Sequence, residues 1–161
     1  EKARVILRKK GSETASKKSD RTLNAGTIGS YVHSTKRVAA LVELSCETDF
    51  VSKNEEFVAL ARDIALHVTA LAPLYITRDE IDAAAREKAR EVFQNEIQDK
   101  PADLQEKILE GKLDAYFKEQ ILMEQAFVKD PDRTIGDLIL SATQKFGERI
   151  AVSAMSRLSV K

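Results

Sequence analysis

The chain has 161 residues, of which 43% are hydrophobic and 32% are charged, a composition that suits one globular unit able to bury its own core. Its 26 basic and 26 acidic residues give a formal net charge of zero, which argues against a protein that binds polyanions over its whole surface. No apolar run approaches the roughly 20 residues of a membrane-spanning helix, and the sequence shows no signal-peptide pattern.

The first 26 residues predict the end of an N-terminal helical module and a linker. Residues 1–10 carry a short apolar run, and Gly11 stands where a helix C-terminal glycine is expected. The chain opens on Glu1 in what reads as mid-helix, so we expect a fragment or a chain that has lost an N-terminal piece. Several basic residues gather in this segment, and solvated charge is a commoner explanation for them than RNA binding.

Residues 27–46 predict an antiparallel hairpin. Residues 27–33 alternate loosely between apolar and polar, residues 37–46 are rich in Val, Ala and Leu, and Ser-Thr-Lys separates the two runs. The single cysteine, Cys46, ends the second run, and we interpret it as a small buried hydrophobe rather than a nucleophile.

The stretch Thr48-Asp49-Phe50-Val51 follows the hairpin and has two interpretations. In the first, the polar pair and Phe50 form an exposed tip that contacts another molecule, because partner contacts concentrate on loops held by rigid elements. In the second, Phe50 packs back on the next helix as a hydrophobic staple. The residues alone leave these two interpretations evenly balanced.

An amphipathic helix is predicted over residues 57–71, where apolar side chains recur every three or four positions. Ser52 with Glu55 predicts a capping box at its start, and Pro73 bounds its end. His67 falls on the apolar side of this helix, where a packing histidine is the default expectation.

Residues 78–120 predict two charged helices joined at Asp99-Lys100-Pro101, with Thr77 and Glu80 as a capping box at the start. Their apolar positions form narrow seams, which favours a protruding antiparallel coiled-coil hairpin. Two ordinary surface helices packed on a sheet are nearly as good an interpretation.

The C-terminal part predicts an extended or irregular segment over residues 121–130, a helix that begins at Thr134 with Asp137 and stops at Gly147, and a half-buried strand over residues 149–160. The fold class is therefore α+β, with a small three-stranded antiparallel sheet covered by helices on one face. The other face is left to water or to a partner. We expect residues 27–161 to form one core domain with residues 78–120 inserted in it.

Enzymatic motifs are missing from the sequence. It has no Gly-rich phosphate loop, no Cys-x-x-Cys, no His-Glu-x-x-His and no Gly-x-Ser-x-Gly. His33, His67 and Cys46 stand at unrelated spacings, a poor start for a zinc site that needs about four ligands. We therefore expect a protein that is not an enzyme and that holds no metal or cofactor.

Residues 47–54 (Glu-Thr-Asp-Phe-Val-Ser-Lys-Asn) resemble a signature of bacterial-type elongation factor Ts, the guanine-nucleotide exchange factor for elongation factor Tu. Five further segments resemble the same family in the same order along the chain. They are residues 64–68 (Ile-Ala-Leu-His-Val), 110–113 (Glu-Gly-Lys-Leu), 124–131 (Glu-Gln-Ala-Phe-Val-Lys-Asp-Pro), 133–138 (Arg-Thr-Ile-Gly-Asp-Leu) and 146–150 (Phe-Gly-Glu-Arg-Ile).

The resemblance implies that elongation factor Tu is the partner and that Phe50, with Asp49 beside it, wedges into its nucleotide domain, so that GDP is released during translation elongation. The partner-binding residues implied in this way are Thr48, Asp49, Phe50, Val51, His67, Phe127, Val128, Phe146 and Gly147. For Phe146 and Gly147, ordinary packing at a helix C-terminus remains a strong alternative.

Two departures from the family pattern stand out. Only the last helix and linker of the family's ubiquitin-associated-like N-terminal module are recognised, so exchange is expected to be weaker. The chain also carries one copy of the core fold, as in short forms that pair into homodimers through the sheet face, and we expect a homodimer in the cytoplasm that has no membrane and no specific nucleic-acid partner. The competing hypotheses are a coiled-coil adaptor that uses residues 78–120 and an RNA-associated ribosomal accessory protein that uses the basic tail.

Overall fold

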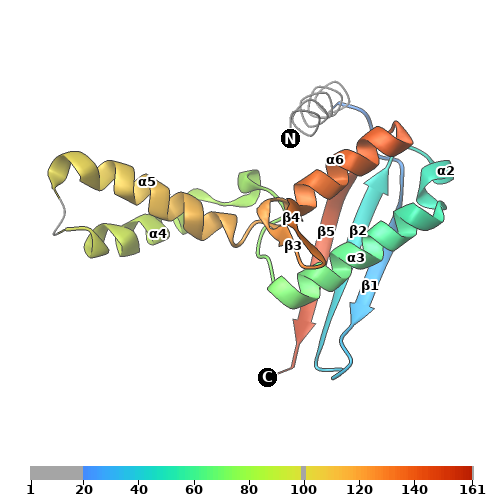
Figure 1. The fold of residues 1–161 in the computed structure, drawn as a ribbon, viewed down its shortest axis with the longest axis horizontal. Coiled ribbons are helices and arrows are strands. Elements are labelled where there is room, and N and C mark those ends of the chain that lie inside the picture. The colour runs from blue at the N-terminus through green and yellow to red at the C-terminus, as the bar shows by residue number, and fades with distance from the viewer. Residues whose placement is uncertain (1–19, 99–100, 161) are drawn as a thin grey trace. The chain divides into compact units, whose positions relative to one another are not determined.

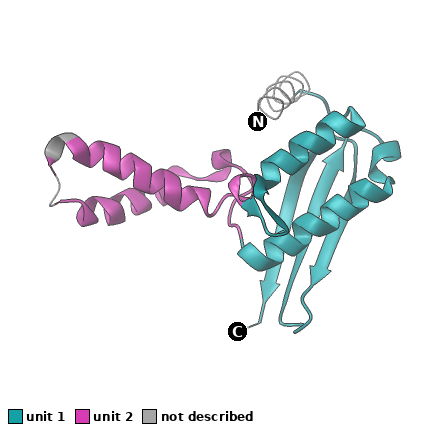
Figure 2. Ribbon diagram, in the orientation of Figure 1, with its two compact units in different colours: residues 1–72, 126–161 teal, residues 73–125 magenta. Residues whose placement is uncertain are grey.

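A computed structural model describes residues 20–98 and 101–160 of the chain, so the expected N-terminal helix lies outside the described residues. The chain divides into two compact units, one of residues 1–72 and 126–161 and the other of residues 73–125 (Figure 2). In sequence, the second unit is therefore inserted within the first. Among the described residues, no helix is both long and apolar enough to cross a membrane.

The first unit contains the predicted three-stranded sheet. Strands β1 (Ala25–Val32), β2 (Val38–Cys46) and β5 (Ala151–Ser159) are ordered β1-β2-β5, and both pairings are antiparallel (Figure 1). The hairpin, the C-terminal strand and the α+β class predicted from the sequence are confirmed. Successive side chains of β2 point to opposite faces of the sheet. One face carries Ala40, Val42 and Leu44, which are buried, and the other carries Leu41 and Glu43, which are exposed.

Helix α3 (Glu55–Leu71) follows a short helix, α2 (Asp49–Ser52), and confirms the predicted amphipathic helix. The predicted capping box of Ser52 and Glu55 is wrong. Asn54 is the N-cap, and its side chain accepts a hydrogen bond from Glu56 N–H at 2.9 Å. Ser52 lies in α2 instead, where its hydroxyl donates to Asp49 O at 3.1 Å. The helix ends at Ala72 in the left-handed conformation.

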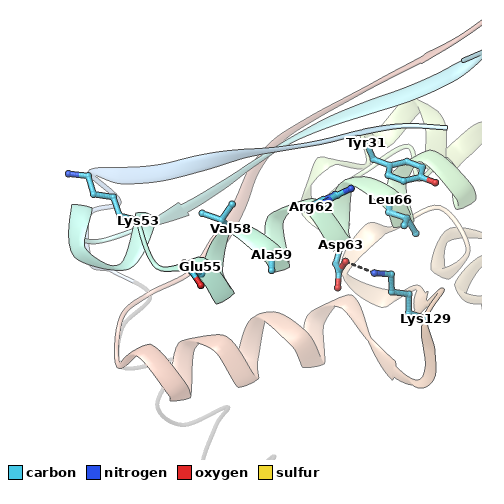
Figure 3. A pocket seen from close by; sticks show the side chains of 9 residues that line it. All are labelled: Tyr31, Lys53, Glu55, Val58, Ala59, Arg62, Asp63, Leu66 and Lys129. Carbon is cyan, nitrogen blue, oxygen red and sulfur yellow. Dashed lines mark hydrogen bonds and ion pairs between the residues drawn. The ribbon is translucent and has the colours of Figure 1, made fainter. Parts of the chain in front are cut away.

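Helix α3 lies close against the sheet. Its buried stripe includes Phe57, Ile64 and Val68, and the helix contacts both β1 and β2. A Cβ on Gly29 of β1 would lie 2.1 Å from Ala61 O, so only glycine permits this separation of helix and strand. Figures 1 and 3 show α6 (Ile135–Phe146) on the same side of the sheet as α3. The predicted capping box of Thr134 and Asp137 and the stop at Gly147 are both confirmed.

Two short strands precede α6 in the part of the chain predicted to be extended or irregular. Strands β3 (Ala126–Phe127) and β4 (Asp130–Thr134) pair antiparallel as a small two-stranded sheet. The preceding residues Leu122–Glu124 form a 3₁₀ turn, η2. Strand β3 agrees with the extended alternative of that prediction, whereas the 3₁₀ turn η2 was not predicted.

The second unit is a helical hairpin of α4 (Ala83–Glu96) and α5 (Ala102–Lys118) with its own small core of Ile81, Ala89, Phe117 and Ile121. The predicted start of the first helix is wrong. Residues Arg78–Glu80 form a 3₁₀ turn, η1, and Asp82 caps α4 by accepting from Ala85 N–H at 2.6 Å. The hairpin itself is confirmed, and its description as a coiled coil stays a prediction.

Candidate functional site

The tip predicted at residues 48–51 exists, and it faces solvent. Phe50 is 85% exposed, the largest exposed fraction among the apolar side chains that the structure describes as exposed. The Asp49 side chain is 79% exposed and lies 3.7 Å from Lys53 Nζ. Val51 and Ser52 are buried and anchor the turn in the rest of the first unit. Phe50 therefore does not pack back on α3, and the interpretation as a hydrophobic staple is not supported.

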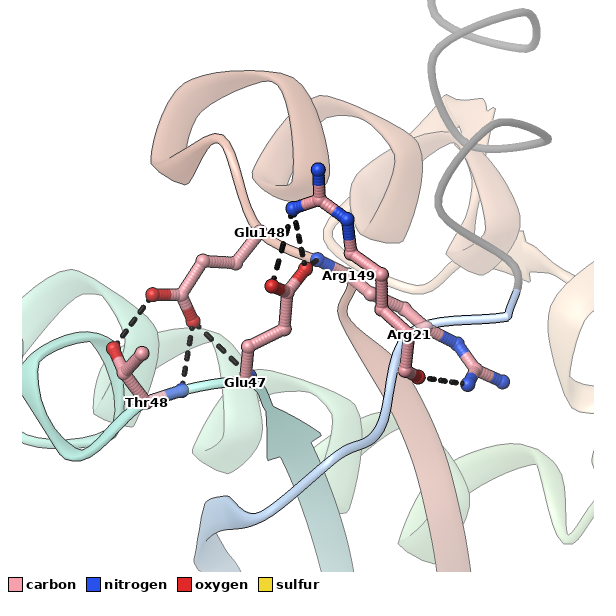
Figure 4. Close-up of polar contacts among 5 residues, drawn as sticks. All are labelled: Arg21, Glu47, Thr48, Glu148 and Arg149. Carbon is pink, nitrogen blue, oxygen red and sulfur yellow. Dashed lines mark hydrogen bonds and ion pairs between the residues drawn. The ribbon is translucent and has the colours of Figure 1, made fainter.

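A polar network fixes the backbone below the tip (Figure 4). The Glu148 carboxylate accepts hydrogen bonds from Glu47 N–H and Thr48 N–H, each at 3.0 Å, and from the Thr48 hydroxyl at 2.6 Å. Glu47 Oε1 in turn accepts from Arg149 N–H at 2.5 Å, and Glu47 Oε2 lies 3.1 Å from Arg21 Nη1. Residues from distant parts of the sequence therefore meet at the end of β2.

Other predicted contact residues lie near the C-terminal part of α3. His67 is fully buried, and its Nδ1 accepts a hydrogen bond from Val128 N–H at 3.2 Å. The ring of Phe127, itself buried, lies 6.0 Å from the His67 ring between centroids. Val128 is 40% exposed, so the group that faces solvent here is Val128 rather than the histidine. An ion pair between Lys129 and Asp63, 2.6 Å long, lies beside it.

The remaining predicted pair, Phe146 and Gly147, ends α6. The ring of Phe146 meets the ring of Phe57 edge-on at 6.0 Å, and Gly147 takes the left-handed conformation with φ of 71°. This is the helix C-terminal packing that the sequence alone suggested. Gly147 directly precedes Glu148, so the pair lies next to the polar network below the tip. Glu148 itself was not predicted as a site residue, although it belongs to the segment 146–150 that carries the family resemblance.

Small-molecule chemistry has little basis in the described residues. A cavity of about 640 Å³ lies beside α3 and is lined by Tyr31, Arg62, Leu66 and neighbouring residues (Figure 3). Its Asp63 and Lys129 are paired with each other. The described residues contain no cluster of three or more His, Cys, Asp or Glu suited to a metal ion. Burial raises the pKa of the Cys46 thiol, and the Glu148 carboxylate raises it further, which keeps the sulfur in its poorly nucleophilic form.

Comparison with known proteins matches residues 13–161 to the family model described as elongation factor TS. Among similar curated proteins, the elongation factor Ts of Herpetosiphon aurantiacus is 48% identical over 96% of this chain and 79% of its own length. Those of Thermodesulfovibrio yellowstonii and Thermotoga petrophila are 46% and 44% identical, each over 99% of this chain and 80% of their own length.

An α+β core that presents an exposed Asp-Phe tip, together with these matches, defines the chain as a translation elongation factor, a protein of protein biosynthesis. Within that class, the chain belongs to the elongation factor Ts family.

Proposed function

We propose that this protein binds elongation factor Tu and accelerates the release of GDP from it. Membership of the elongation factor Ts family supports the proposal, and the observation that carries it is the exposed aromatic ring of Phe50. When a partner covers this exposed ring, a large apolar surface is removed from water, which makes the ring suitable as an anchor in an interface.

The tip would act by thermodynamic linkage rather than by bond chemistry. A protein that binds nucleotide-free factor Tu more tightly than the GDP complex must weaken GDP binding by the same factor. Phe50 supplies the apolar wedge, and Asp49 supplies a negative charge that competes with the phosphates for their positive surroundings. Thr48 and Val51 shape the turn, because Thr48 is held by Glu148 and Val51 is buried.

We propose a second contact at Val128. Because His67 is buried, it serves this contact indirectly by accepting the Val128 N–H, while Phe127 packs against its ring. Phe146 and Gly147 are further contact candidates, and Gly147 is the exposed member of that pair.

We also propose that two copies pair through the open face of the sheet, with residues 27–161 as the dimerisation domain and residues 78–120 as its insertion. The register places Val32 opposite Ala39 and Ala39 opposite Leu158, so all three share one face with Leu41. The large apolar side chains on this face are more than half exposed: Ile28 60%, Val32 62%, Leu41 52% and Leu158 74%. Because protein synthesis occurs there, we place the activity in the cytoplasm.

The test is the release of a fluorescent GDP analogue from elongation factor Tu, followed with wild type, Phe50→Ala and Val92→Ala. Val92 is an exposed apolar residue on α4 (53%) and provides a matched control. We expect wild type and Val92→Ala to accelerate release equally. Phe50→Ala should lose about 30-fold or more of that acceleration, as expected for truncation of an interface anchor worth at least about 2 kcal/mol.

Each outcome has a separate meaning. Acceleration that survives Phe50→Ala would move the action away from the tip and toward the other contacts. No acceleration by wild type would contradict the exchange function and leave the adaptor reading, which then predicts that deletion of residues 78–120 abolishes partner binding.

A further inference from the structure

We propose that Glu148 is the positioning residue of the tip: its carboxylate sets the backbone at Glu47 and Thr48, from which Asp49 and Phe50 project. The inference rests on the proposed exchange function and adds a residue to it. Glu148 does not need to touch the partner, because it acts through the two residues that it holds.

The geometry below the tip carries the inference (Figure 4). One carboxylate accepts three hydrogen bonds from two consecutive residues: Glu47 N–H at 3.0 Å, Thr48 N–H at 3.0 Å and the Thr48 hydroxyl at 2.6 Å. These hydrogen bonds have a charged acceptor and are stronger than neutral ones. Residues 47 and 48 are the only chain between the last residue of β2, Cys46, and the first residue of α2, Asp49.

Among the described residues, helix α2 is otherwise held at its start by local contacts only: the Cys46 thiol donates to Thr48 O at 3.3 Å, and the Ser52 hydroxyl donates to Asp49 O at 3.1 Å. The helix has four residues, too few to be stable by itself. Thr48 occupies its N-cap position, yet its side chain makes no capping hydrogen bond to α2, and its hydroxyl donates to Glu148 instead. The contact that normally holds a helix start from within is therefore replaced by one from a residue 100 positions later in the sequence.

The neighbours of Glu148 in the chain fix its own position. Gly147, in its left-handed conformation, ends α6 and turns the chain directly into Glu148. Phe146 packs against Phe57 of α3 on one side of Glu148. On the other side, Arg149 N–H donates to the Glu47 carboxylate, so the two segments exchange hydrogen bonds in both directions. Phe146 and Gly147 thus support the tip through Glu148.

Three substitutions separate hydrogen bonding from charge. Glu148→Ala removes all three hydrogen bonds. Glu148→Asp keeps the charge but shortens the side chain by one methylene group, so the carboxylate no longer reaches residues 47 and 48. Glu148→Gln removes the charge but keeps an oxygen at the same reach, which still accepts from both backbone N–H groups.

The readout is the rate of GDP-analogue release from elongation factor Tu over a range of concentrations of each variant. We expect Glu148→Ala and Glu148→Asp to lower the maximal release rate by at least about tenfold, because the loss of even one hydrogen bond to a charged group has an effect of this order. The concentration for half-maximal release should change little, and Glu148→Gln should restore most of the rate. A purely structural role gives the opposite split, because a smaller folded fraction raises the half-maximal concentration and leaves the maximal rate intact.

Two further measurements complete the test. In the Phe50→Ala background, Glu148→Ala should cause a smaller loss than in wild type, since a residue that acts through the tip has less effect once the Phe50 ring is gone. Amide hydrogen exchange of the free protein should accelerate at residues 47 and 48 in Glu148→Ala and stay unchanged in β1.

The outcomes that overturn the inference differ from failure of the proposed function. Wild-type release with Glu148→Ala equal to wild type overturns the positioning role alone. Full activity of Glu148→Asp with loss in Glu148→Gln assigns the effect to charge and also overturns it. No acceleration by wild type overturns the exchange function, and the positioning role falls with it.

Discussion

Phe50 and Phe57 show how one residue type takes opposite roles within a few positions. The ring of Phe57 is fully buried and meets Phe146, whereas the ring of Phe50 is 85% exposed. Burial of an aromatic ring stabilises the fold by about 1.5–3 kcal/mol. Phe57 already contributes this free energy to folding, and that of Phe50 remains available for binding a partner.

Cys46 allows a prediction of pH dependence. Burial and the nearby Glu148 carboxylate raise the pKa of this thiol in the folded chain above its unfolded value of about 8.5. Above that pH the unfolded chain releases the thiol proton while the folded chain retains it, so the free energy of unfolding falls as pH rises. The slope reaches at most about 1.4 kcal/mol per pH unit.

The measurement is urea unfolding from pH 7 to 10 with wild type and Cys46→Ala. The difference between the two variants isolates the thiol, since their other titrating groups are the same. We expect the stability advantage of wild type to shrink above about pH 8.5. A difference that is flat across this range would show that the thiol ionises as readily in the folded chain as in the unfolded one.

At the scale of elements, the contact between β1 and α3 leaves no room for an added side-chain atom. A Cβ added at Gly29 would lie 2.1 Å from Ala61 O, a backbone atom that moves only with the helix. We expect Gly29→Ala to lower the free energy of unfolding by about 3 kcal/mol, the upper range for an overpacked core. Gly111 is the matched control, because it lies inside α5 and a Cβ there meets nothing within 4 Å.

For Gly111→Ala we expect a gain of about 0.5–1 kcal/mol from helix propensity. Both values come from urea unfolding followed by circular dichroism. Equal effects of the two substitutions would mean that α3 shifts away from the sheet without cost.

Elements with strong local signals were predicted from the sequence, and elements that depend on tertiary contacts were not. The period of apolar residues located α3, and Thr134 with Asp137 located the start of α6. The same capping pattern failed at Ser52 and Thr77, because Asn54 and Asp82 stand closer to the true helix starts and make the caps. Strand β3 has two residues, too few for a period to show.

The candidate site, too, was predicted from the sequence only in part. The family resemblance located the tip, yet only the structure gives the exposure of Phe50 and the burial of His67. The sequence pattern could not identify Glu148 as a site residue, since its hydrogen-bond partners lie about 100 positions away and no local pattern links them.

For the whole molecule, the open sheet face predicts the oligomeric state. Leu41 lies at the centre of that face, opposite Ser30 of β1 and Ser156 of β5. We expect wild type to be a dimer at tens of micromolar, an order suited to modest interfaces. Leu41→Lys should give a monomer, because it would place two like charges near the two-fold axis of the pair.

Light scattering and analytical ultracentrifugation provide the measurement. Val58→Lys is the control, since Val58 is an exposed residue (43%) on α3, which covers the opposite face of the sheet. It should leave the dimer intact. A monomeric wild type would contradict the pairing, and a dimer that survives Leu41→Lys would place the interface elsewhere.

The insertion of residues 73–125 between the two parts of the first unit affects how the chain folds as it leaves the ribosome. Strand β2 lies between β1 and β5, so it emerges with one neighbour and waits for the other until residues 151–159 have been made. Glu148 emerges just before that strand. During synthesis, the helical hairpin can fold while the sheet is still incomplete, and the tip gains its anchor only after the hairpin has been made.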